Sequence, residues 1–340
     1  MKNPLKFCAA LALSLTAALS QADTTKLTLS SWLPSGHPLV KDVIVPWTEQ
    51  VEQATEGRVE IVMLPSALGH PKMHYDIARD GQADITYGAH GYTPGRFKLY
   101  KMVEFPFGGD SAEATSVAYW KVYNQSLGKA GEHRDVQLLG LFTHGPGHIH
   151  NSRKTVSAAA DLKGLKLRVG GGIMNDLASD LGAVTLQKPS SSIYELMSSG
   201  VADGTLFPLE SVTAFNIQDK ATHTTLVPGG LYNFSFFVAM NRDRFAGLSQ
   251  QDQDAVMSVS GEALARLAGR VWDRVDAAAL EALKTNGNEI TEAPEALIDE
   301  VRASVDPMVE AWQAEAAELG IDGAAALQAF RAESDAPAAP

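Results

Sequence analysis

The sequence predicts an α/β protein of two lobes followed by long helices. Apolar residues make up 45% of the 340-residue chain, enough to form the core of one large domain or of two domains of ordinary size. Segments with strand patterns alternate with segments of helical pattern, first over 26–87 and again over 111–207. This alternation is typical of a parallel sheet covered by helices. After residue 249 only long helical stretches follow.

The first series of elements begins with the alternating apolar and polar residues of KLTLSSW at 26–32. Pro38 favours a helix start, and Gly57 follows the helical stretch as a helix-ending residue does. The predicted elements of this part are strands at 26–32, 59–64, 83–87 and 136–142, and helices at 40–55, 72–78 and 111–125.

The second series contains shorter elements, and Gly182 and Gly200 end two of its helical stretches. Ser249 is a suitable N-cap for the first of two long helices. The predicted elements are strands at 165–169, 183–186, 202–207 and 234–241, and helices at 173–181, 190–199, 250–284 and 296–319.

The first 22 residues have the pattern of an export signal rather than that of a folded element. Two lysines precede an apolar stretch that is short for a membrane span, and small residues follow it up to Ala22. We therefore expect residues 1–22 to be a signal peptide that is cleaved near Ala22, which makes the mature protein periplasmic. At the other end, the composition of 334–340 predicts a mobile tail.

Charge and cysteine content argue against several classes of function. The net charge is −12, and loss of Lys2 and Lys6 with the signal takes it to −14, which does not suit a nucleic acid partner. The same cleavage removes Cys8, the sole cysteine, so the mature chain has no disulfide and no thiol nucleophile. We expect a monomer that binds no cofactor, no metal and no nucleic acid.

Arg168 is the residue whose position points most directly to a function. It ends a predicted strand just before the glycines at 170–172, and a predicted helix begins at Ile173. Glycines let a ligand approach the backbone, and a helix start offers free amides and the positive end of a dipole. An arginine there suits a carboxylate, which the planar guanidinium can bind through two hydrogen bonds. The alternative is a surface arginine paired with an acid such as Asp161.

The histidines of THGPGHIH leave a second chemistry open. His144, His148 and His150 would lie on one face of a continuous strand, as the ligands of a zinc site do. Glycine and proline interrupt that strand, however, so hydrogen-bonding histidines at a cleft or hinge are favoured. The glycines at 170–172 match no nucleotide-binding motif, and the chain contains no serine-hydrolase or zinc-protease motif. We therefore expect no enzyme activity.

The loops after the predicted strands are where a ligand is expected, because ligands of open α/β sheets bind beyond the carboxyl ends of the strands. These loops are rich in aromatic residues, which suits a mostly apolar small-molecule site. The candidate ligand-binding residues are Arg168, His148, His144, Phe207, Trp32, His90, Tyr92, Gly170 and Asn233.

Five segments give the chain a family resemblance: SSWLPSGHPL, DIARDGQADITYGAHGYTPGRF, DLKGLKLRV, LGAVTLQKPSSSIYELMSSGVADGTLFPLESV and VAMNRDRFAGLSQQDQDAV. Together with the export signal, they resemble the DctP-type solute-binding proteins of TRAP transporters. The resemblance implies a two-lobed periplasmic binding protein fold (Venus flytrap) with a long helix spanning both lobes. We expect lobe one at 24–147 plus 233–255, lobe two at 148–232, and connecting and C-terminal helices at 249–320.

The resemblance also implies a function. It implies a periplasmic receptor that closes on a small organic acid, grips its carboxylate with Arg168 and delivers it to the TRAP membrane permease. Members that bind sialic acid-type ligands carry a second arginine where this chain has His148, and an asparagine where it has Phe207. These differences favour a monocarboxylate with an apolar or aromatic body. The alternatives are an ABC-type receptor or, less favoured, a periplasmic hydrolase or metal-binding protein.

A pH-dependent contact is a further hypothesis for the two histidines. If His144 or His148 donated to the ligand as an imidazolium, affinity would fall as the pH rises through about 6.5.

Overall fold

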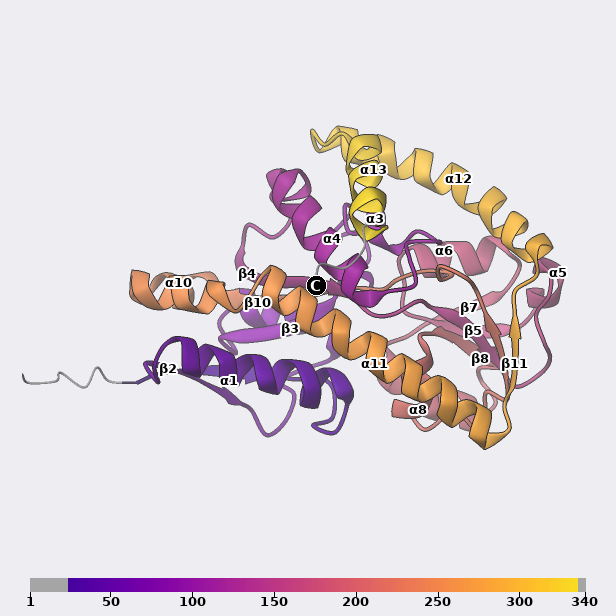
Figure 1. Cartoon of the computed structure of the whole chain (residues 1–340), viewed down its shortest axis with the longest axis horizontal. Helices are drawn as coiled ribbons and strands as arrows, with labels where there is room; N and C mark the ends of the chain where they lie inside the picture. Colours follow the sequence, from indigo (N-terminus) through magenta and orange to yellow (C-terminus); the bar gives the residue numbers. More distant parts are fainter. Residues whose placement is uncertain (1–23, 336–340) are drawn as a thin grey trace, which may run out of the picture.

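The computed structural model describes residues 24–335, so the expected signal peptide lies outside the described residues. It consists of two lobes, each built on a mixed sheet with helices packed against it (Figure 1). The first sheet has the strand order β2-β1-β3-β10-β4, and the second has the order β11-β9-β5-β8-β6-β7. The two-lobed α/β fold expected from the sequence is confirmed.

The first sheet is parallel at one edge and antiparallel at the other. β1 pairs in parallel with β2 and β3, whereas β10 runs antiparallel to both β3 and β4. The parallel arrangement that the alternation predicts therefore fails at β10, because this strand returns from the second lobe in the opposite direction. The strands are β1 (Thr25–Ser30), β2 (Val59–Met63), β3 (Ile85–Ala89), β4 (Val136–Thr143) and β10 (Ser235–Asn241).

Most helices of the first lobe begin near where the sequence predicts. The helix expected from residue 40 starts at Leu39, but its first turns are a π-helix, η1. The start of α4 is satisfied from two sides: the Ser111 hydroxyl accepts from the Ala114 N–H, and Asp273 of the later helix α11 (Glu262–Asn286) accepts from the Ala112 N–H. The helices are η1 (Leu39–Ile44), α1 (Val45–Ala54), η2 (Pro71–Met73), α2 (His74–Arg79), η3 (His90–Tyr92), α3 (Lys101–Glu104), α4 (Ala112–Gln125) and η4 (Leu127–Ala130).

The second lobe contains short strands that the sequence patterns miss, namely β5, β9 and β11. β6 pairs in parallel with β7 and β8, while β5 runs antiparallel to β8 and β9. The strands are β5 (His148–Asn151), β6 (Lys166–Val169), β7 (Val184–Gln187), β8 (Gly204–Phe207), β9 (His223–Leu226) and β11 (Glu289–Glu292). The helices are α5 (Ala159–Leu162), α6 (Ile173–Asp180), η5 (Ser190–Ser192), α7 (Ile193–Ser198) and α8 (Leu209–Ala214).

A break precedes the helix that connects the lobes. The helix predicted over 250–284 is two helices, α10 (Gln250–Ser258) and α11 (Glu262–Asn286). Gly261 lies between them with a φ of +58°, and a Cβ added there would meet the Trp120 ring at 2.7 Å, so glycine is required at this turn. α11 then runs from α4 and β4 of the first lobe to α8 of the second (Figure 1). The expected helix spanning both lobes is thereby confirmed.

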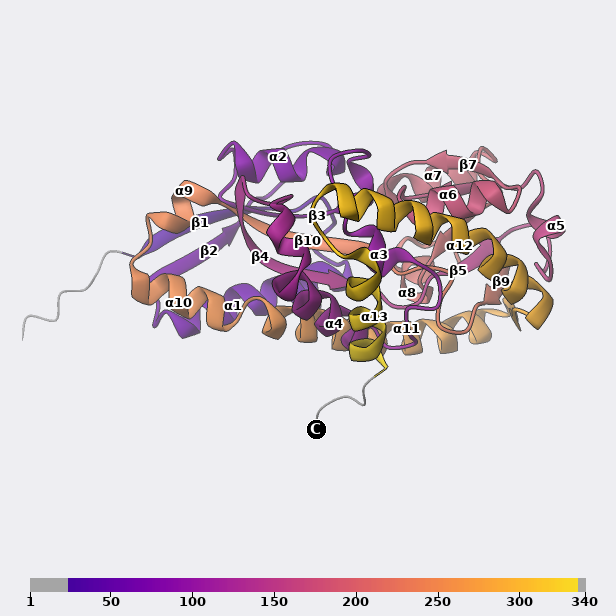
Figure 2. The ribbon, with the colours of Figure 1, turned by 90° about the horizontal axis from the view of Figure 1, so that it is seen from above.

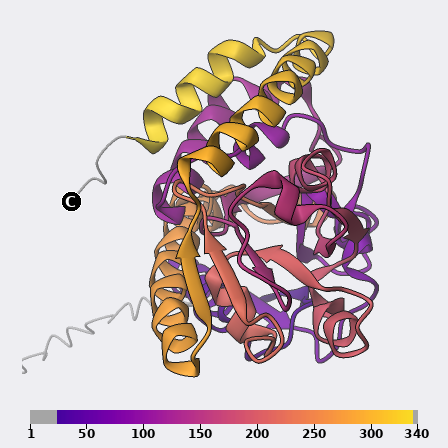
Figure 3. The same cartoon turned by 90° about the vertical axis from the view of Figure 1, so that its right-hand side faces the viewer.

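Two further helices complete the described chain. α12 (Glu295–Glu318), predicted over 296–319, packs on α5 and α6 of the second lobe, and α13 (Gly323–Ser334) packs on α4 of the first (Figures 2 and 3). The sequence patterns do not predict α13. Because this helix continues through the buried Ser334, residue 334 is not part of a tail, and residues 336–340 lie outside the described residues.

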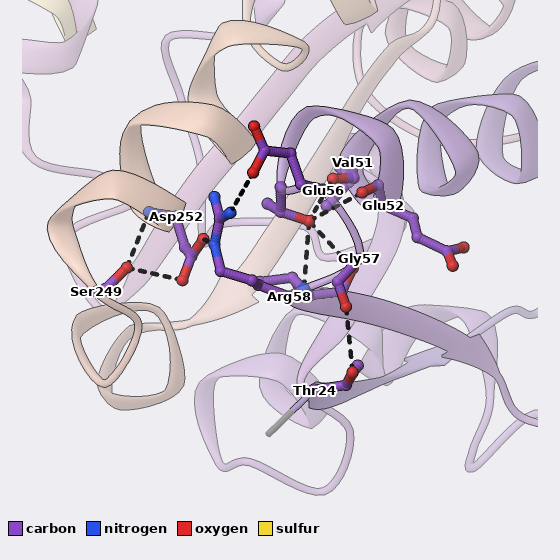
Figure 4. Close-up of polar contacts among 10 residues, drawn as sticks. Thr24, Val51, Glu52, Glu56, Gly57, Arg58, Ser249 and Asp252 are labelled. Carbon is purple, nitrogen blue, oxygen red and sulfur yellow. Dashed lines mark hydrogen bonds and ion pairs between the residues drawn. The ribbon is translucent and has the colours of Figure 1, made fainter. Parts of the chain in front are cut away.

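Polar contacts join α10 to the outer edge of the first sheet. Immediately before β2, the Nε of Arg58 donates to Asp252 of α10 at 2.8 Å, and a terminal nitrogen donates to Glu56 at 3.0 Å (Figure 4). The Ser249 hydroxyl caps α10 by accepting from the Asp252 N–H at 3.1 Å. A short helix, α9 (Arg242–Ala246), leads from β10 into this region.

Within residues 24–335, no helix is long and apolar enough to cross a membrane.

Candidate functional site

Side chains from both lobes and from α11 line a cavity of about 30 Å³. Five of the nine candidate residues line it: Arg168, His144, Phe207, Trp32 and Tyr92. Most of them lie where a strand ends, as expected from the α/β architecture. The small volume indicates that the lobes are closed in this structure, so an organic acid can enter only when they separate.

Arg168 is a buried cation on β6. Its side chain is 2% exposed, its Nε donates to the Lys188 carbonyl oxygen at 2.8 Å, and its guanidinium lies 4.8 Å from the centre of the Phe207 ring. Among residues 24–335, no carboxylate forms an ion pair with it, and Asp161 pairs with Lys154 at 2.8 Å instead. The alternative of a surface arginine paired with Asp161 is therefore wrong.

The charge of Arg168 persists despite this burial. Burial lowers the pKa of the guanidinium, while the nearby Tyr92 and Tyr232 oppose that shift. An arginine side chain nevertheless stays protonated in proteins. A buried charge is costly unless an opposite charge and hydrogen bonds compensate it. The site therefore suits a carboxylate that reaches the guanidinium from the cavity.

The glycine turn after β6 contacts the first lobe rather than the cavity. A Cβ added at Gly171 would lie 2.3 Å from the Gly91 carbonyl oxygen, and one at Gly172 would clash with Glu104. Both glycines have positive φ, which favours glycine there. The Ile173 N–H at the start of α6 donates to Glu104 at 3.3 Å. A side chain of the first lobe therefore already engages this amide in the closed structure, which argues against the sequence-based expectation that this helix start binds the ligand.

Tyr92 makes a second polar contact between the lobes. Its hydroxyl accepts from the Ser190 N–H at 3.0 Å and donates to the Ser190 hydroxyl at 3.3 Å. Tyr92 belongs to η3 of the first lobe, and Ser190 begins η5 of the second. This contact and the one between Glu104 and Ile173 both depend on the closed arrangement.

Aromatic rings form most of the remaining cavity wall. Trp32 and Tyr92 pack edge to face at 5.6 Å between ring centroids, and Phe207 stacks on Phe215 at 5.7 Å. The aromatic lining residues are Trp32, Tyr92, Phe207, Phe215, Tyr232, Phe234, Phe236 and Trp272. Such a wall offers an apolar ligand body a large complementary surface next to one buried cation.

His144 lies in this wall as a neutral ring. Its Nδ1 hydrogen-bonds to the Gly145 carbonyl oxygen at 2.5 Å, and burial lowers its pKa to about 4. His148 lines a different groove, behind β5 and next to α11, where its Nδ1 accepts from the Val227 N–H at 3.1 Å. Burial lowers the pKa of His148 to about 3. At neutral pH both rings are therefore neutral imidazoles rather than imidazolium ions, which argues against the imidazolium hypothesis.

His90, Asn233 and Gly170 support the site from outside the cavity lining. Buried His90 contacts His133 at 2.8 Å and the Ser235 hydroxyl at 2.9 Å. The Asn233 side chain donates to the His144 carbonyl oxygen at 3.1 Å. Gly170 leaves room for Phe234, whose ring a Cβ there would meet at 2.7 Å. Asn233 and Gly170 thus orient or accommodate lining residues, whereas the hydrogen bonds of His90 go to residues outside the lining.

The histidines of THGPGHIH do not converge on a common point. His150 hydrogen-bonds to the Thr224 hydroxyl and to the Phe207 carbonyl oxygen, so its contacts differ from those of His144 and His148. Within residues 24–335, no group of three His, Cys, Asp or Glu side chains is arranged to hold a metal ion.

Some lining residues carry no signal that the sequence patterns reveal. Trp272 lies on α11, where its spacing resembles that of an ordinary core residue, and it reaches the cavity only because α11 crosses both lobes. His37 precedes η1, and its Nε2 lies 3.6 Å from Glu210 of α8. Ser190 follows β7, so a complete survey of the loops after strands would include it.

Comparisons with known proteins agree with this geometry. The family model of bacterial extracellular solute-binding proteins, family 7 (DctP), matches residues 29–316. The outer membrane transporter protein TsaT of Comamonas testosteroni is 30% identical over 97% of this chain and 98% of its own length.

Solved structures of similar proteins contain aromatic acids. A TRAP periplasmic solute-binding protein of Bordetella bronchiseptica with bound (R)- and (S)-mandelate is 47% identical, with a TM-score of 0.89 over 91% of this chain and 98% of its own. A TRAP solute-binding protein of Rhodoferax ferrireducens with copurified benzoate is 29% identical, with a TM-score of 0.85 over 92% and 98%. A marine metagenome protein with 3-hydroxybenzoate is 30% identical, with the same TM-score and coverage.

The family match covers most of the chain, and the fold, with its two lobes and spanning helix, agrees with that of the TRAP receptors. This chain therefore belongs to the DctP family, the solute-binding proteins of TRAP transporters.

Proposed function

We propose that this protein is the receptor for an aromatic monocarboxylic acid and that Arg168 binds the carboxylate of this ligand. The observation that carries the proposal is a buried guanidinium with no carboxylate partner among residues 24–335, set in a wall of aromatic rings. The three similar proteins crystallised with mandelate, benzoate or 3-hydroxybenzoate support an aromatic ligand.

The guanidinium provides the positive charge for the contact and also determines the direction from which a ligand carboxylate can bind. Its planar face is already covered by Phe207, and its Nε is engaged by the Lys188 carbonyl oxygen, so the two terminal nitrogens are the groups left for a ligand. A carboxylate placed there can accept two parallel hydrogen bonds. The aromatic body of the ligand then packs among Trp32, Phe234 and the rings beside them.

Closure of the lobes completes the binding event. The ligand contacts both lobes only when they are together, so it shifts the population towards the closed form. The contacts from Tyr92 to Ser190 and from Glu104 to Ile173 form in the same step and add to its free energy. Water is excluded, which strengthens the ion pair between the carboxylate and Arg168.

The biological setting follows from the family and from the export pattern of 1–22. The receptor, released into the periplasm after cleavage near Ala22, delivers its closed, loaded form to the TRAP membrane permease. It acts as a binding protein rather than as an enzyme. The net charge of −14 expected after cleavage does not prevent anion binding, because screening at about 8 Å leaves the contact with Arg168 dominant over distant acids.

A thermal-shift panel tests the proposal. Benzoate, mandelate and phenylacetate should each raise the melting temperature, because a ligand that binds only the folded state stabilises it. Benzamide, which keeps the ring but lacks the charge, and glucuronate, which keeps the charge but lacks the ring, should raise it far less. A stronger response to glucuronate than to every aromatic acid would overturn the proposal.

A further inference from the structure

The imidazole of His144 is held in one orientation. Its own carbonyl oxygen accepts from the Asn233 side chain at 3.1 Å, and its backbone N–H donates to the Phe234 carbonyl oxygen at 3.4 Å. Its ring packs edge to face against Tyr232 at 5.1 Å and against Trp272 at 5.9 Å. His144 is 4% exposed and lines the cavity that contains Arg168. The ring is therefore a fixed part of the cavity wall.

The hydrogen bond at Nδ1 determines where the ring proton lies. The Gly145 carbonyl oxygen can only accept, so the neutral imidazole must carry its proton on Nδ1 and donate it there. Nε2 is consequently an acceptor. Among residues 24–335, no donor hydrogen-bonds to this nitrogen.

The hydroxyl groups of the wall are already engaged in hydrogen bonds. The Tyr92 and Ser190 hydroxyls share a hydrogen bond, the Tyr232 hydroxyl donates to the Leu206 carbonyl oxygen at 3.1 Å, and the Ser211 hydroxyl donates to Glu210 at 2.9 Å. Among residues 24–335, the groups of the wall left for a ligand are thus of two kinds: the terminal N–H groups of Arg168 and the indole N–H groups of Trp32 and Trp272, which donate, and His144 Nε2, which accepts. A carboxylate alone satisfies only the first.

We infer that His144 Nε2 accepts a hydrogen bond from a ligand hydroxyl next to the carboxylate, so that the receptor prefers 2-aryl-2-hydroxy acids to aryl acids that lack the hydroxyl. This inference rests on the proposed function and narrows its ligand class. His144 lies within electrostatic reach of the Arg168 guanidinium, in the same cavity of about 30 Å³. A hydroxyl on the carbon that carries the carboxylate would give the ligand a donor directly beside the group that binds Arg168.

Paired ligands and paired variants measure the contact. Calorimetric Kd values of wild type should be about tenfold lower for mandelate than for phenylacetate, as expected for one added hydrogen bond that would otherwise be missing. The methyl ether 2-methoxy-2-phenylacetate, which cannot donate, should lose this advantage. His144→Phe, which keeps an aromatic ring but removes the acceptor, should lower mandelate affinity about tenfold more than it lowers phenylacetate affinity. His144→Gln, whose carbonyl oxygen can accept, should restore part of the preference.

The control is His70→Phe, a change at an exposed histidine of the first lobe, which should leave both affinities as in wild type. Equal binding of mandelate and phenylacetate by wild type, or an unchanged preference in His144→Phe, would overturn the inference while leaving the proposed function intact. If His144→Phe does not fold, as judged by its melting curve, the comparison of mandelate with its methyl ether in wild type decides. If none of the three acids binds, the proposed function fails and this inference fails with it.

Discussion

In the closed structure, Arg168 and the glycine turn that follows it differ in the groups that they contact. In sequence they are separated by one residue, and both suit an anion. In the structure the helix start after the turn is satisfied by Glu104 of the first lobe, whereas the guanidinium of Arg168 faces a cavity and pairs with no carboxylate among residues 24–335. The comparison supports the proposal that the cation, rather than the helix amides, binds the ligand.

The reason lies in how closely the lobes approach each other at the turn. Gly171 and Gly172 meet Gly91 and Glu104 at distances that exclude any side chain, so these glycines serve lobe contact. A ligand placed at the same helix start would have to displace Glu104, which also accepts from the Ser235 N–H at 3.2 Å. Arg168 requires no such displacement.

Replacing Arg168 should have the largest effect on binding. Arg168→Met removes the charge that compensates a buried carboxylate, and breaking such a pair costs about 3–5 kcal/mol. Affinity for an aromatic acid should therefore fall by about two to four orders of magnitude, as measured by calorimetry. The melting temperature of the ligand-free variant should stay the same or rise, because a buried cation without a carboxylate partner is removed.

Two variants make this result specific. Arg168→Lys keeps a positive charge but loses the planar fork, so it should recover only part of the affinity. Arg134→Met, at a residue whose side chain is 79% exposed, should leave binding unchanged. Near-native affinity in Arg168→Met would show that the ligand lies elsewhere and would remove the contrast with the glycine turn.

Replacing Glu104 tests the other side of the comparison, with a smaller effect. Glu104→Leu leaves the Ile173 N–H without a partner in the closed form only, and an unsatisfied buried donor costs about 1–3 kcal/mol. Ligand affinity should fall roughly tenfold. Glu104→Gln keeps one acceptor oxygen in a side chain of the same size and should lose less. Unchanged affinity in Glu104→Leu, together with a lower melting temperature, would mean that Glu104 only stabilises the first lobe through Ser235.

Local patterns predict most of the regular elements but not how they pair. The apolar run of FSFFVAMN identifies β10, yet no pattern within it encodes that the strand runs antiparallel to β3 and β4. Helical periodicity continues through 259–261, which hides the turn at Gly261 that packing against Trp120 requires. The short β5 and β9 are missed because four residues carry too little periodicity.

The candidate site was predictable only in part, for a similar reason. Position after a strand identifies Arg168, Phe207 and Tyr92, because parallel strands bring their carboxyl ends to one edge. Asp161 forms an ion pair with Lys154, seven residues earlier in the sequence, and not with Arg168. Residue spacing alone does not show which of these two cations the aspartate contacts. Glu104 reaches the Ile173 N–H at the start of α6 only because the two lobes pack together there. Residue spacing along the sequence does not predict this contact.

The buried histidines provide a third test of this comparison. They are buried like Arg168, but, unlike an arginine, a histidine can become neutral when it is buried. Burial lowers the pKa of seven histidines. The pKa falls to about 4 for His37, His74, His144 and His150 and to about 3 for His133 and His148, and it is also lowered for His90. In the unfolded chain they take up protons as the pH falls through about 6.5, whereas in the folded protein they do not, so stability is lost on acidification.

The melting temperature should therefore fall by roughly 5 °C or more between pH 6.5 and pH 5. Differential scanning calorimetry in buffers of equal ionic strength measures it. A melting temperature that is flat over this range would mean that the folded protein takes up as many protons as the unfolded chain, which would contradict neutral buried histidines.

The smallest effect is expected on the alkaline side, where buried carboxyl groups, Glu210 and Asp276 among them, act in the opposite sense. Burial raises the pKa of Glu210 to about 8 and that of Asp276 to about 7. Because both pKa values are raised in the folded protein, the stability that these groups contribute is full below their usual pKa values and is lost as the pH rises to about 8. A fall of a few degrees between pH 6.5 and 8 should follow, and Glu210→Gln, which cannot ionise, should reduce it, whereas Glu195→Gln at an exposed position should not. An unchanged slope in Glu210→Gln would assign the alkaline loss to other groups, such as Asp276.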